Sequence, residues 1–158
     1  MSTFEEINID VPSDENTEYY NRSFIIHCPN NITEPLRAFF YFPGTGTKSK
    51  SGVRIFKDLI NEGNTIGIYV QGSIGNDDVT TFNTGYDGLK TSAHDVEFVK
   101  LIYEYLLENY KEKVDFDNMV AIGFSVGSAF TAKLSITDEV SNYFKGFIFE
   151  SSVNQKNE

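Results

Sequence analysis

The sequence predicts an α/β fold with a mostly parallel sheet, and three observations support this fold class. Short apolar runs alternate along the 158 residues with segments whose apolar side chains recur at helical spacing, which is typical of β-α-β units. Residues 36–42 are almost all apolar, as expected of a central strand that is buried on both faces. Glycine-rich turns follow two of the apolar runs, at residues 43–47 and 123–127. Because ligands bind beyond the carboxyl ends of parallel strands, we expect both turns to lie at one rim of the sheet.

An antiparallel hairpin is predicted at the start of the chain. Residues 5–11 alternate in part between polar and apolar side chains, which indicates a short edge strand, and residues 12–16 read as a turn. Residues 23–28 are the second strand, and two strands joined by a polar connection form a hairpin. His27 lies late in that strand, where we interpret it as a side chain packed on the sheet.

Three helices and three further strands complete the predicted order up to residue 150, and the third helix follows the turn at 123–127. Apolar spacing predicts one helix around residues 53–60 and an amphipathic helix of about five turns that begins after residues 91–92. Thr91 or Ser92 can cap the second helix, and Asp95 is favourably placed in its first turn. Strands are predicted at residues 65–70, 119–122 and 147–150, a turn at 115–118, and a long, pocket-lining polar connection at 71–92.

Residues 119–127 read as a nucleophile elbow, because a buried strand runs into a G-x-S-x-G turn that opens a helix. The serine of such a turn, here Ser125, has a strained backbone that exposes its hydroxyl above the sheet. Gly123 and Gly127 lack side chains because the turn brings helix and strand backbones too close for a Cβ. The helix directs its first N–H groups, including that of Val126, at developing negative charge. We predict Ser125 as a nucleophile; the alternative is an ordinary β-α connection with this pattern by chance.

The glycine-rich turn at residues 43–47 has two interpretations. It is either a flexible connection or an oxyanion loop, in which the N–H groups around Gly44 and Thr45 point at a reacting carbonyl. It lacks the lysine-terminated pattern of a phosphate-binding loop, so a nucleotide site is not expected.

The composition of the chain excludes several classes of partner and location. A net charge of −10 argues against a nucleic-acid or anionic-membrane partner. Cys28 is the only cysteine, which excludes an internal disulfide and fits a reducing compartment. The first six residues are acidic where a secretory signal would be basic and then apolar, and no run approaches the ~18 apolar residues of a membrane span. We expect a cytoplasmic protein with no cofactor and no metal; secretion by another route stays open.

Over about residues 22–150 the sequence resembles the α/β-hydrolase fold, and more narrowly the polyhydroxybutyrate-depolymerase and feruloyl-esterase-like group of serine esterases. It departs from that group at Pro43, where a histidine is usual, at Phe82, where a tryptophan is usual, and at Ser128, where a glycine is usual. The resemblance implies a three-layer sandwich and ester hydrolysis. It divides the chain into an edge strand and turn (1–20), a partial hydrolase domain (21–153) and a polar tail (154–158). The matching segments are 22–24 with Pro29, 42–44, 67–72, 81–85, 95–99 and 114–115.

A serine nucleophile requires a base, and no histidine follows Ser125. Related enzymes place the acid and histidine on later strands, so the resemblance implies a hydrolase fold whose later strands are missing. Of the two histidines, His27 should point to the opposite rim, whereas His94 should lie on the rim of Ser125. His94 is therefore the candidate base, with a solvated helix-start residue as the alternative. Glu150 is the candidate acid, because some lipases of this fold place theirs there; the alternative is a structural role.

Two functions remain open at this point. The first is an ester hydrolase that acts on a small or polymeric ester and uses Ser125 as its nucleophile. Its base and acid would be missing from this chain, because the sequence is a truncated gene model or a fragment. The second is an inactive hydrolase-like module that binds an ester-like ligand or another protein. In either case the apolar strand at 147–150 would be an uncovered edge, which predicts self-association.

Overall fold

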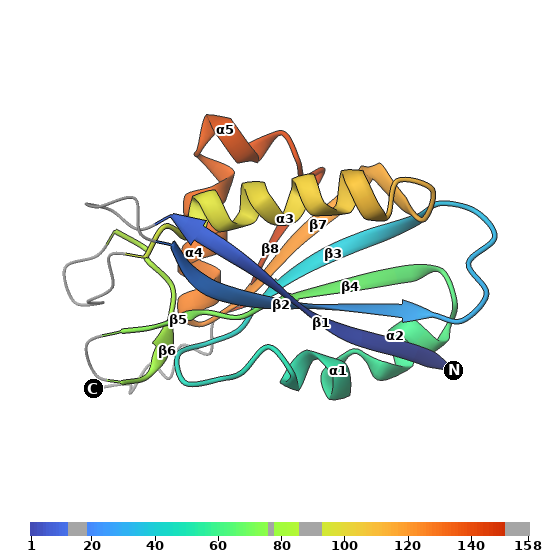
Figure 1. Ribbon diagram of the computed structural model, residues 1–158, viewed down its shortest axis with the longest axis horizontal. Helices are drawn as coiled ribbons and strands as arrows, with labels where there is room; N and C mark the ends of the chain where they lie inside the picture. The colour runs from blue at the N-terminus through green and yellow to red at the C-terminus, as the bar shows by residue number, and fades with distance from the viewer. Residues whose placement is uncertain (13–18, 76–77, 86–92, 151–158) are drawn as a thin grey trace, which may run out of the picture.

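Apolar runs and helical segments alternate in the structure as they do in the sequence. The structure is a computed structural model that describes residues 1–12, 19–75, 78–85 and 93–150. A six-stranded sheet has the order β1-β2-β4-β3-β7-β8. Helices α3, α4 and α5 lie on one face of this sheet, and α1 and α2 lie on the other (Figure 1). The sheet strands are β1 (Ser2–Pro12), β2 (Tyr19–Pro29), β3 (Leu36–Phe42), β4 (Thr65–Val70), β7 (Val114–Phe124) and β8 (Gly146–Glu150). The helices are α1 (Ser51–Ile55), α2 (Lys57–Asn61), α3 (Asp95–Asn109), α4 (Val126–Ser135) and α5 (Asp138–Ser141), and β5 (Ser73–Ile74) pairs with β6 (Thr80–Thr81).

The predicted mixture of strand directions is confirmed. β1 and β2 form an antiparallel hairpin, β2 is antiparallel to β4, and β4, β3, β7 and β8 run parallel. The hairpin strands are longer than the sequence predicted, because β1 is an edge strand whose side chains are largely exposed. Exposed positions do not need apolar residues, so a strand predicted from hydrophobic alternation is shorter than the real one.

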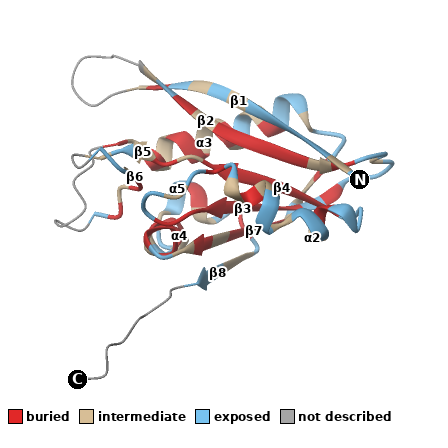
Figure 2. Ribbon diagram, turned by 90° about the horizontal axis from the view of Figure 1, so that it is seen from below, coloured by how far each residue is buried: buried red, intermediate tan, exposed pale blue. Residues whose placement is uncertain are grey.

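The core lies on both faces of the central strands, which are the buried part of the sheet in Figure 2. The face under α3 and α4 carries the larger cluster, in which Phe130 of α4 stacks on Phe82 with ring centroids 5.1 Å apart. The same ring meets Phe42 at the end of β3 edge to face, at 5.2 Å. Aromatic pairs of this kind add about 0.5–1.5 kcal/mol beyond the apolar area that they bury. They fix α4 over the end of β3.

The helix predicted at residues 53–60 is divided into two short helices at Phe56. The Phe56 backbone leaves the helical region, with φ −103° and ψ 10°. Its ring packs against Phe39 and Tyr41, with centroids 4.7 and 5.1 Å away. Packing of this aromatic ring against the sheet outweighs the helical spacing, which is a local preference of less than about 1 kcal/mol per residue.

The turn predicted at residues 115–118 lies inside strand β7 instead. The pairing of β7 with β3 is irregular there, since Leu36 pairs with Val114 and Ala38 pairs with Met119. The Asp115 carboxylate accepts a hydrogen bond from the Asp117 N–H at 3.1 Å. The turn-forming residues therefore make a bulge within a strand, a local irregularity that the same residue types favour.

Strand β8 is the uncovered edge that the sequence predicted at residues 147–150, and self-association through it stays a prediction. It is the last strand of the sheet, and Ile148 and Phe149 are 50% and 52% exposed. In Figure 2 it lies apart from the buried centre of the sheet.

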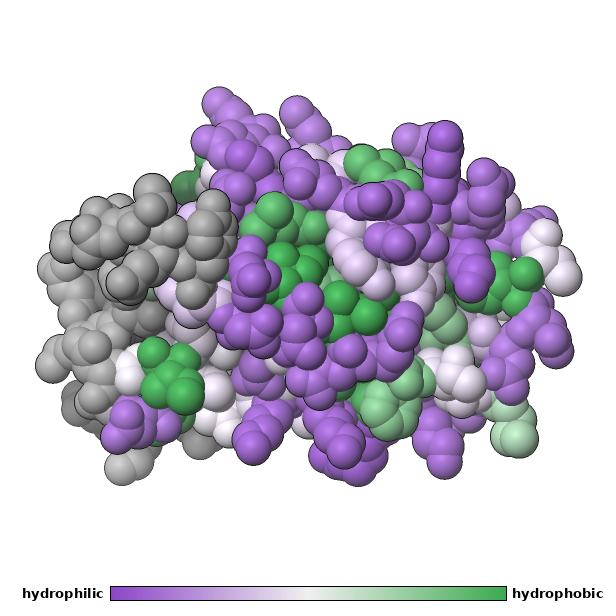
Figure 3. All heavy atoms as spheres, in the orientation of Figure 1, coloured by the Kyte–Doolittle hydropathy of each residue, from purple (hydrophilic) through white to green (hydrophobic). Residues whose placement is uncertain are grey.

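The visible surface is otherwise mostly polar. Figure 3 shows hydrophilic side chains over most of one face, with smaller apolar patches between them. The helix predicted to begin after residues 91–92 is α3, with His94 at its N-cap position; Thr91 and Ser92, the predicted caps, lie outside the described residues. Among the described helices, none is both long and apolar enough to cross a membrane.

Candidate active site

Ser125 is the single residue between strand β7 and helix α4. Its backbone has φ 55° and ψ −119°, a combination that side-chain-bearing L-residues rarely adopt. Its N–H donates to the Glu150 carbonyl of β8 at 2.8 Å, and its carbonyl accepts from the Ser128 N–H at 2.9 Å. The residue is exposed. The predicted sharp, strained corner between strand and helix is therefore present, with a serine at its tip.

The two glycines of the elbow stand where no other residue fits. A Cβ on Gly127 would lie 1.9 Å from the Phe42 carbonyl oxygen, and a Cβ on Gly123 would lie 2.2 Å from the Gly127 carbonyl oxygen. Both distances are far inside van der Waals contact. The Thr131 hydroxyl of α4 donates to the Gly127 carbonyl at 2.8 Å, so this side chain also lies at the contact between helix and strand. The pattern G-x-S-x-G is thus a packing requirement of this corner.

The glycine-rich loop after β3 lies against Ser125, as the sequence predicted. A Cβ on Gly44 would be 3.3 Å from the Ser125 Cβ. The Thr47 N–H donates to the Gly44 carbonyl at 3.0 Å, which closes a turn within the loop. The Gly46 N–H donates to the Thr80 carbonyl at 2.8 Å and connects the loop to the segment after β4, so all three predicted rim segments meet at one place.

Donors for a developing oxyanion are available in principle at this corner. Val126 is the first residue of α4, so its N–H has no acceptor within the helix. Gly44 is buried beside Ser125, and Thr45 follows it at the exposed turn. The positive end of the helix dipole lies at the same point. The roles of Gly44, Thr45 and Val126 as oxyanion donors stay predictions.

His27 is a structural residue at the far part of β2. Its side chain is buried, Nδ1 lies 2.7 Å from the Tyr69 hydroxyl, and Nε2 lies 3.0 Å from the Ser2 hydroxyl. Burial lowers the pKa of the His27 imidazole, which favours its neutral form. Both ring nitrogens are engaged, in agreement with the interpretation of His27 as a packed side chain.

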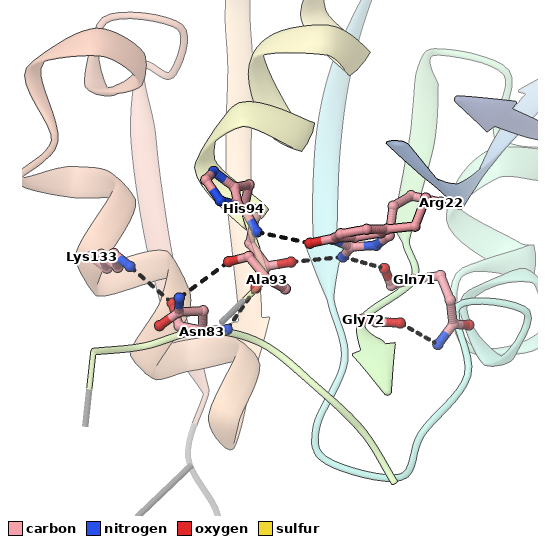
Figure 4. A network of polar contacts seen from close by, with 9 residues as sticks. Arg22, Gln71, Gly72, Asn83, Ala93, His94 and Lys133 are labelled. Carbon is pink, nitrogen blue, oxygen red and sulfur yellow. Dashed lines mark hydrogen bonds and ion pairs between the residues drawn. The ribbon is translucent and has the colours of Figure 1, made fainter. Parts of the chain in front are cut away.

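His94 lies at the N-terminus of α3, and its backbone N–H donates to the Tyr20 hydroxyl at 3.3 Å. It borders a small opening together with Asn83 and Lys133, as Figure 4 shows from close by. Lys133 is two helical turns beyond Ser125, a rise of about 12 Å along α4. The structure thus gives His94 neighbours at the far part of α4, and its pairing with Ser125 stays a prediction.

Glu150 is the last residue of β8, opposite Phe124 in the pairing with β7. Its carbonyl holds the Ser125 N–H, whereas the residue as a whole is exposed. The contact with the serine corner is therefore made by the backbone, and a role of the Glu150 carboxylate as acid stays a prediction.

A buried ion pair near the rim is the feature that the sequence did not reveal. Arg22 Nη2 lies 2.7 Å from Asp95 Oδ1, and the two side chains are 4% and 1% exposed. The second oxygen of Asp95 accepts from the Asn83 N–H at 2.6 Å, and Arg22 Nη2 also donates to the Gln71 carbonyl at 3.1 Å. Asp95 was expected to act on the dipole of its own helix. Its main partner is instead a residue of β2, 73 positions away.

This network connects the elements that form the rim (Figure 4). The Asn83 side chain donates to the Ala93 carbonyl at 3.1 Å, and Lys133 Nζ of α4 donates to the Asn83 carbonyl at 3.0 Å. Burial raises the pKa of the Asp95 carboxyl, while the Arg22 charge and the Asn83 N–H oppose that rise. Among the described residues, no group of three or more His, Cys, Asp and Glu side chains could hold a metal ion.

The strain at Ser125 predicts an unusual order of stabilities. Ser125→Gly should be more stable than Ser125→Ala by about 1 kcal/mol, because relief of about 1–3 kcal/mol of strain exceeds the entropic cost of glycine. Urea unfolding of both variants measures the difference. At Ser135, the last residue of α4, the same pair of substitutions should give the opposite order, since glycine is disfavoured in helices. An alanine variant at 125 as stable as the glycine variant would contradict the strained corner.

The fold is shared with solved esterases. A bacterial heroin esterase superposes with a TM-score of 0.61 at 17% identity, covering 87% of this chain and 40% of that one. A fungal esterase from Rhizomucor miehei gives 0.63 at 17% identity, covering 93% and 43%. An S-formylglutathione hydrolase from Staphylococcus aureus gives 0.62 at 14% identity, covering 89% and 54%. The chain therefore has the α/β-hydrolase fold and spans 40–54% of the length of these enzymes. No protein-family model and no curated protein matches the sequence.

Proposed function

We propose that this chain carries the nucleophile of a serine carboxylic-ester hydrolase and that Ser125 is that nucleophile. The observation that carries the proposal is the backbone of Ser125, which is held at φ 55° between β7 and α4. Such a conformation costs about 1–3 kcal/mol for a residue with a side chain and is typical of functional sites. Solved esterases with the same fold support the reaction class. Within this class, the sequence resemblance favours the polyhydroxybutyrate-depolymerase and feruloyl-esterase-like group.

The proposed chemistry follows from the groups at the corner. The Ser125 oxygen adds to the carbonyl carbon of an ester, the carbonyl π electrons move to the oxygen, and the hydroxyl proton passes to a base. The Val126 N–H and the backbone around Gly44 and Thr45 donate to the resulting oxyanion. As this intermediate collapses, the protonated base gives its proton to the alkoxide oxygen, so the alcohol leaves and an acyl group stays on Ser125. Water then adds to the acyl carbonyl and releases the carboxylic acid and the free serine. The base is His94 or a histidine outside these 158 residues.

A second candidate function is a binding module that keeps the hydrolase fold without turnover. It is favoured by one observation, which is that both ring nitrogens of His27 are engaged, by the Tyr69 and Ser2 hydroxyls. In this alternative the rim binds an ester-like ligand, and the serine corner is retained as architecture.

Labelling with a fluorophosphonate probe tests the proposal. The folded protein should form one covalent adduct, located on Ser125 by peptide mass spectrometry, and Ser125→Ala should reduce the labelling rate at least tenfold. Ser135→Ala, in the last turn of the same helix, should label like the native protein. Folded protein that forms no adduct would favour the binding module, and an adduct that persists in Ser125→Ala would refute Ser125 as the nucleophile.

A further inference from the structure

A cavity of about 780 Å³ opens at the rim beside the glycine-rich loop. Its walls come from the start of β2, from residues 48–50 and from residues 71–74, together with Glu6, Thr80 and Ala93. Cavities of about 300–1,000 Å³ are the size that proteins use for small-molecule ligands. Nothing in the proposed chemistry at Ser125 uses this cavity.

The sheet order sets the distance between the cavity and Ser125. The cavity lies over the ends of β2 and β4, Ser125 lies at the end of β7, and β3 stands between β4 and β7. Two strand spacings separate β4 from β7, which is about 10 Å. The loop after β3 joins the two places directly, because Gly44 packs on Ser125 and the Ser49 N–H donates to the Gln71 side chain at 2.8 Å.

The charges around the cavity differ in sign from the protein as a whole. The chain has a net charge of −10, yet the charged side chains among the described lining residues are Lys48, Lys50, Arg22 and Glu6. Lys48 and Lys50 are exposed on either side of the buried Ser49. Arg22 is paired with Asp95, and its Nε and Nη1 are buried without a hydrogen-bond partner. A local positive excess in an acidic protein attracts an anionic group.

We propose that this cavity binds a carboxylate carried by the substrate, so that the preferred esters are monoesters of long dicarboxylic acids. The inference rests on the proposed function for its catalytic half, since it places the scissile carbonyl at Ser125. The carboxylate binds between Lys48 and Lys50, and a spacer of about eight carbon–carbon bonds matches the two strand spacings, about 10 Å, between β4 and β7. Glu6 and Asp95 oppose a second negative charge, which favours a carboxylate over a phosphate dianion.

Neutral side chains of the cavity complete the site for a polar end group. Tyr20, Asn21, Gln71 and Ser73 line it and offer hydroxyl and amide groups. Ile25 and Ile74 supply apolar surface for the spacer. A small number of polar groups in a partly apolar cavity is the usual composition of a ligand site.

Calorimetric titration with monomethyl sebacate, its neutral analogue dimethyl sebacate, and octyl phosphate tests the proposal. Monomethyl sebacate should bind at least tenfold more tightly than the other two. The Lys48→Gln/Lys50→Gln variant should lose this preference without losing its fold, because both lysines are exposed. Lys57→Gln, an exposed lysine of α2 outside the cavity, is the matched control and should bind like the native protein.

Each outcome bears on one half of the inference. Equal binding of the two sebacate esters, or a lysine double variant that binds normally, would overturn the carboxylate site. Tighter binding of octyl phosphate would also overturn it and point to a phosphate. Lysine-dependent binding by folded protein that is not labelled by fluorophosphonate would leave the carboxylate site standing and remove only the hydrolase proposal.

Discussion

Gly127→Ala is expected to lower the free energy of unfolding by at least about 3 kcal/mol, at the upper end of the cost of overpacking a core. The added Cβ would lie 1.9 Å from the Phe42 carbonyl oxygen and 2.7 Å from the Pro43 carbonyl oxygen. Both are backbone atoms, so no rotation of a side chain can remove the clash. Helix α4 would have to move away from β3, which would also separate the Phe130 ring from Phe42. Urea unfolding followed by circular dichroism measures the loss.

Gly146→Ala is the matched control for this prediction. Gly146 begins β8, and a Cβ built on it meets no atom within 4 Å. Its free energy of unfolding should stay within about 0.5 kcal/mol of that of the native protein, as for most surface substitutions. A Gly127→Ala variant as stable as this control would show that α4 does not pack on β3 in the way described.

Arg22→Met is expected to lower the free energy of unfolding by about 3–5 kcal/mol, because it leaves the buried Asp95 carboxylate without its counter-charge. The methionine has nearly the length of the arginine stem and keeps contact with Phe98, over which the guanidinium lies at 4.5 Å. Loss of packing should therefore be small, and the effect should report the ion pair. Asp95→Leu should cost a similar amount, since it leaves the arginine unpaired.

The double variant Arg22→Met/Asp95→Leu provides the decisive comparison. Replacing both charges of a buried pair by apolar groups is often nearly neutral, so the double variant should be more stable than either single one. Lys100→Met removes the exposed pair of Lys100 with Glu139, 3.1 Å apart, and should change stability little. Additive losses in the double variant would mean that Arg22 and Asp95 act independently and that the pair is not a unit.

The local features of this protein could be predicted from sequence because their causes are local. The elbow needs a strand, two glycines and a helix within about ten residues, and the loop at 43–47 needs glycines directly after a buried strand. That these two segments meet follows from parallel strands, whose carboxyl ends share one rim. The class of fold and the position of Ser125 between strand and helix could therefore be predicted from the sequence.

The features that escaped prediction depend on contacts between distant segments. Arg22 and Asp95 are 73 residues apart, and each has an ordinary explanation in its own neighbourhood. The break at Phe56 exists because the ring packs on β3, and the bulge at 115–118 exists because β7 continues beside β3. Local propensity amounts to tenths of a kcal/mol per residue, whereas one buried aromatic ring contributes several times more.

The backbone bond between Ser125 and Glu150 makes the serine corner mechanically dependent on the outermost strand. The Ser125 N–H is anchored to the final residue of β8, whose outer edge has no neighbour in the described sheet. Fraying of that edge would release this bond from β8 to the strained peptide, whereas a further strand paired there would hold β8, and with it the bond, in place. The geometry of the Ser125 backbone therefore depends on a strand that is paired on one side only.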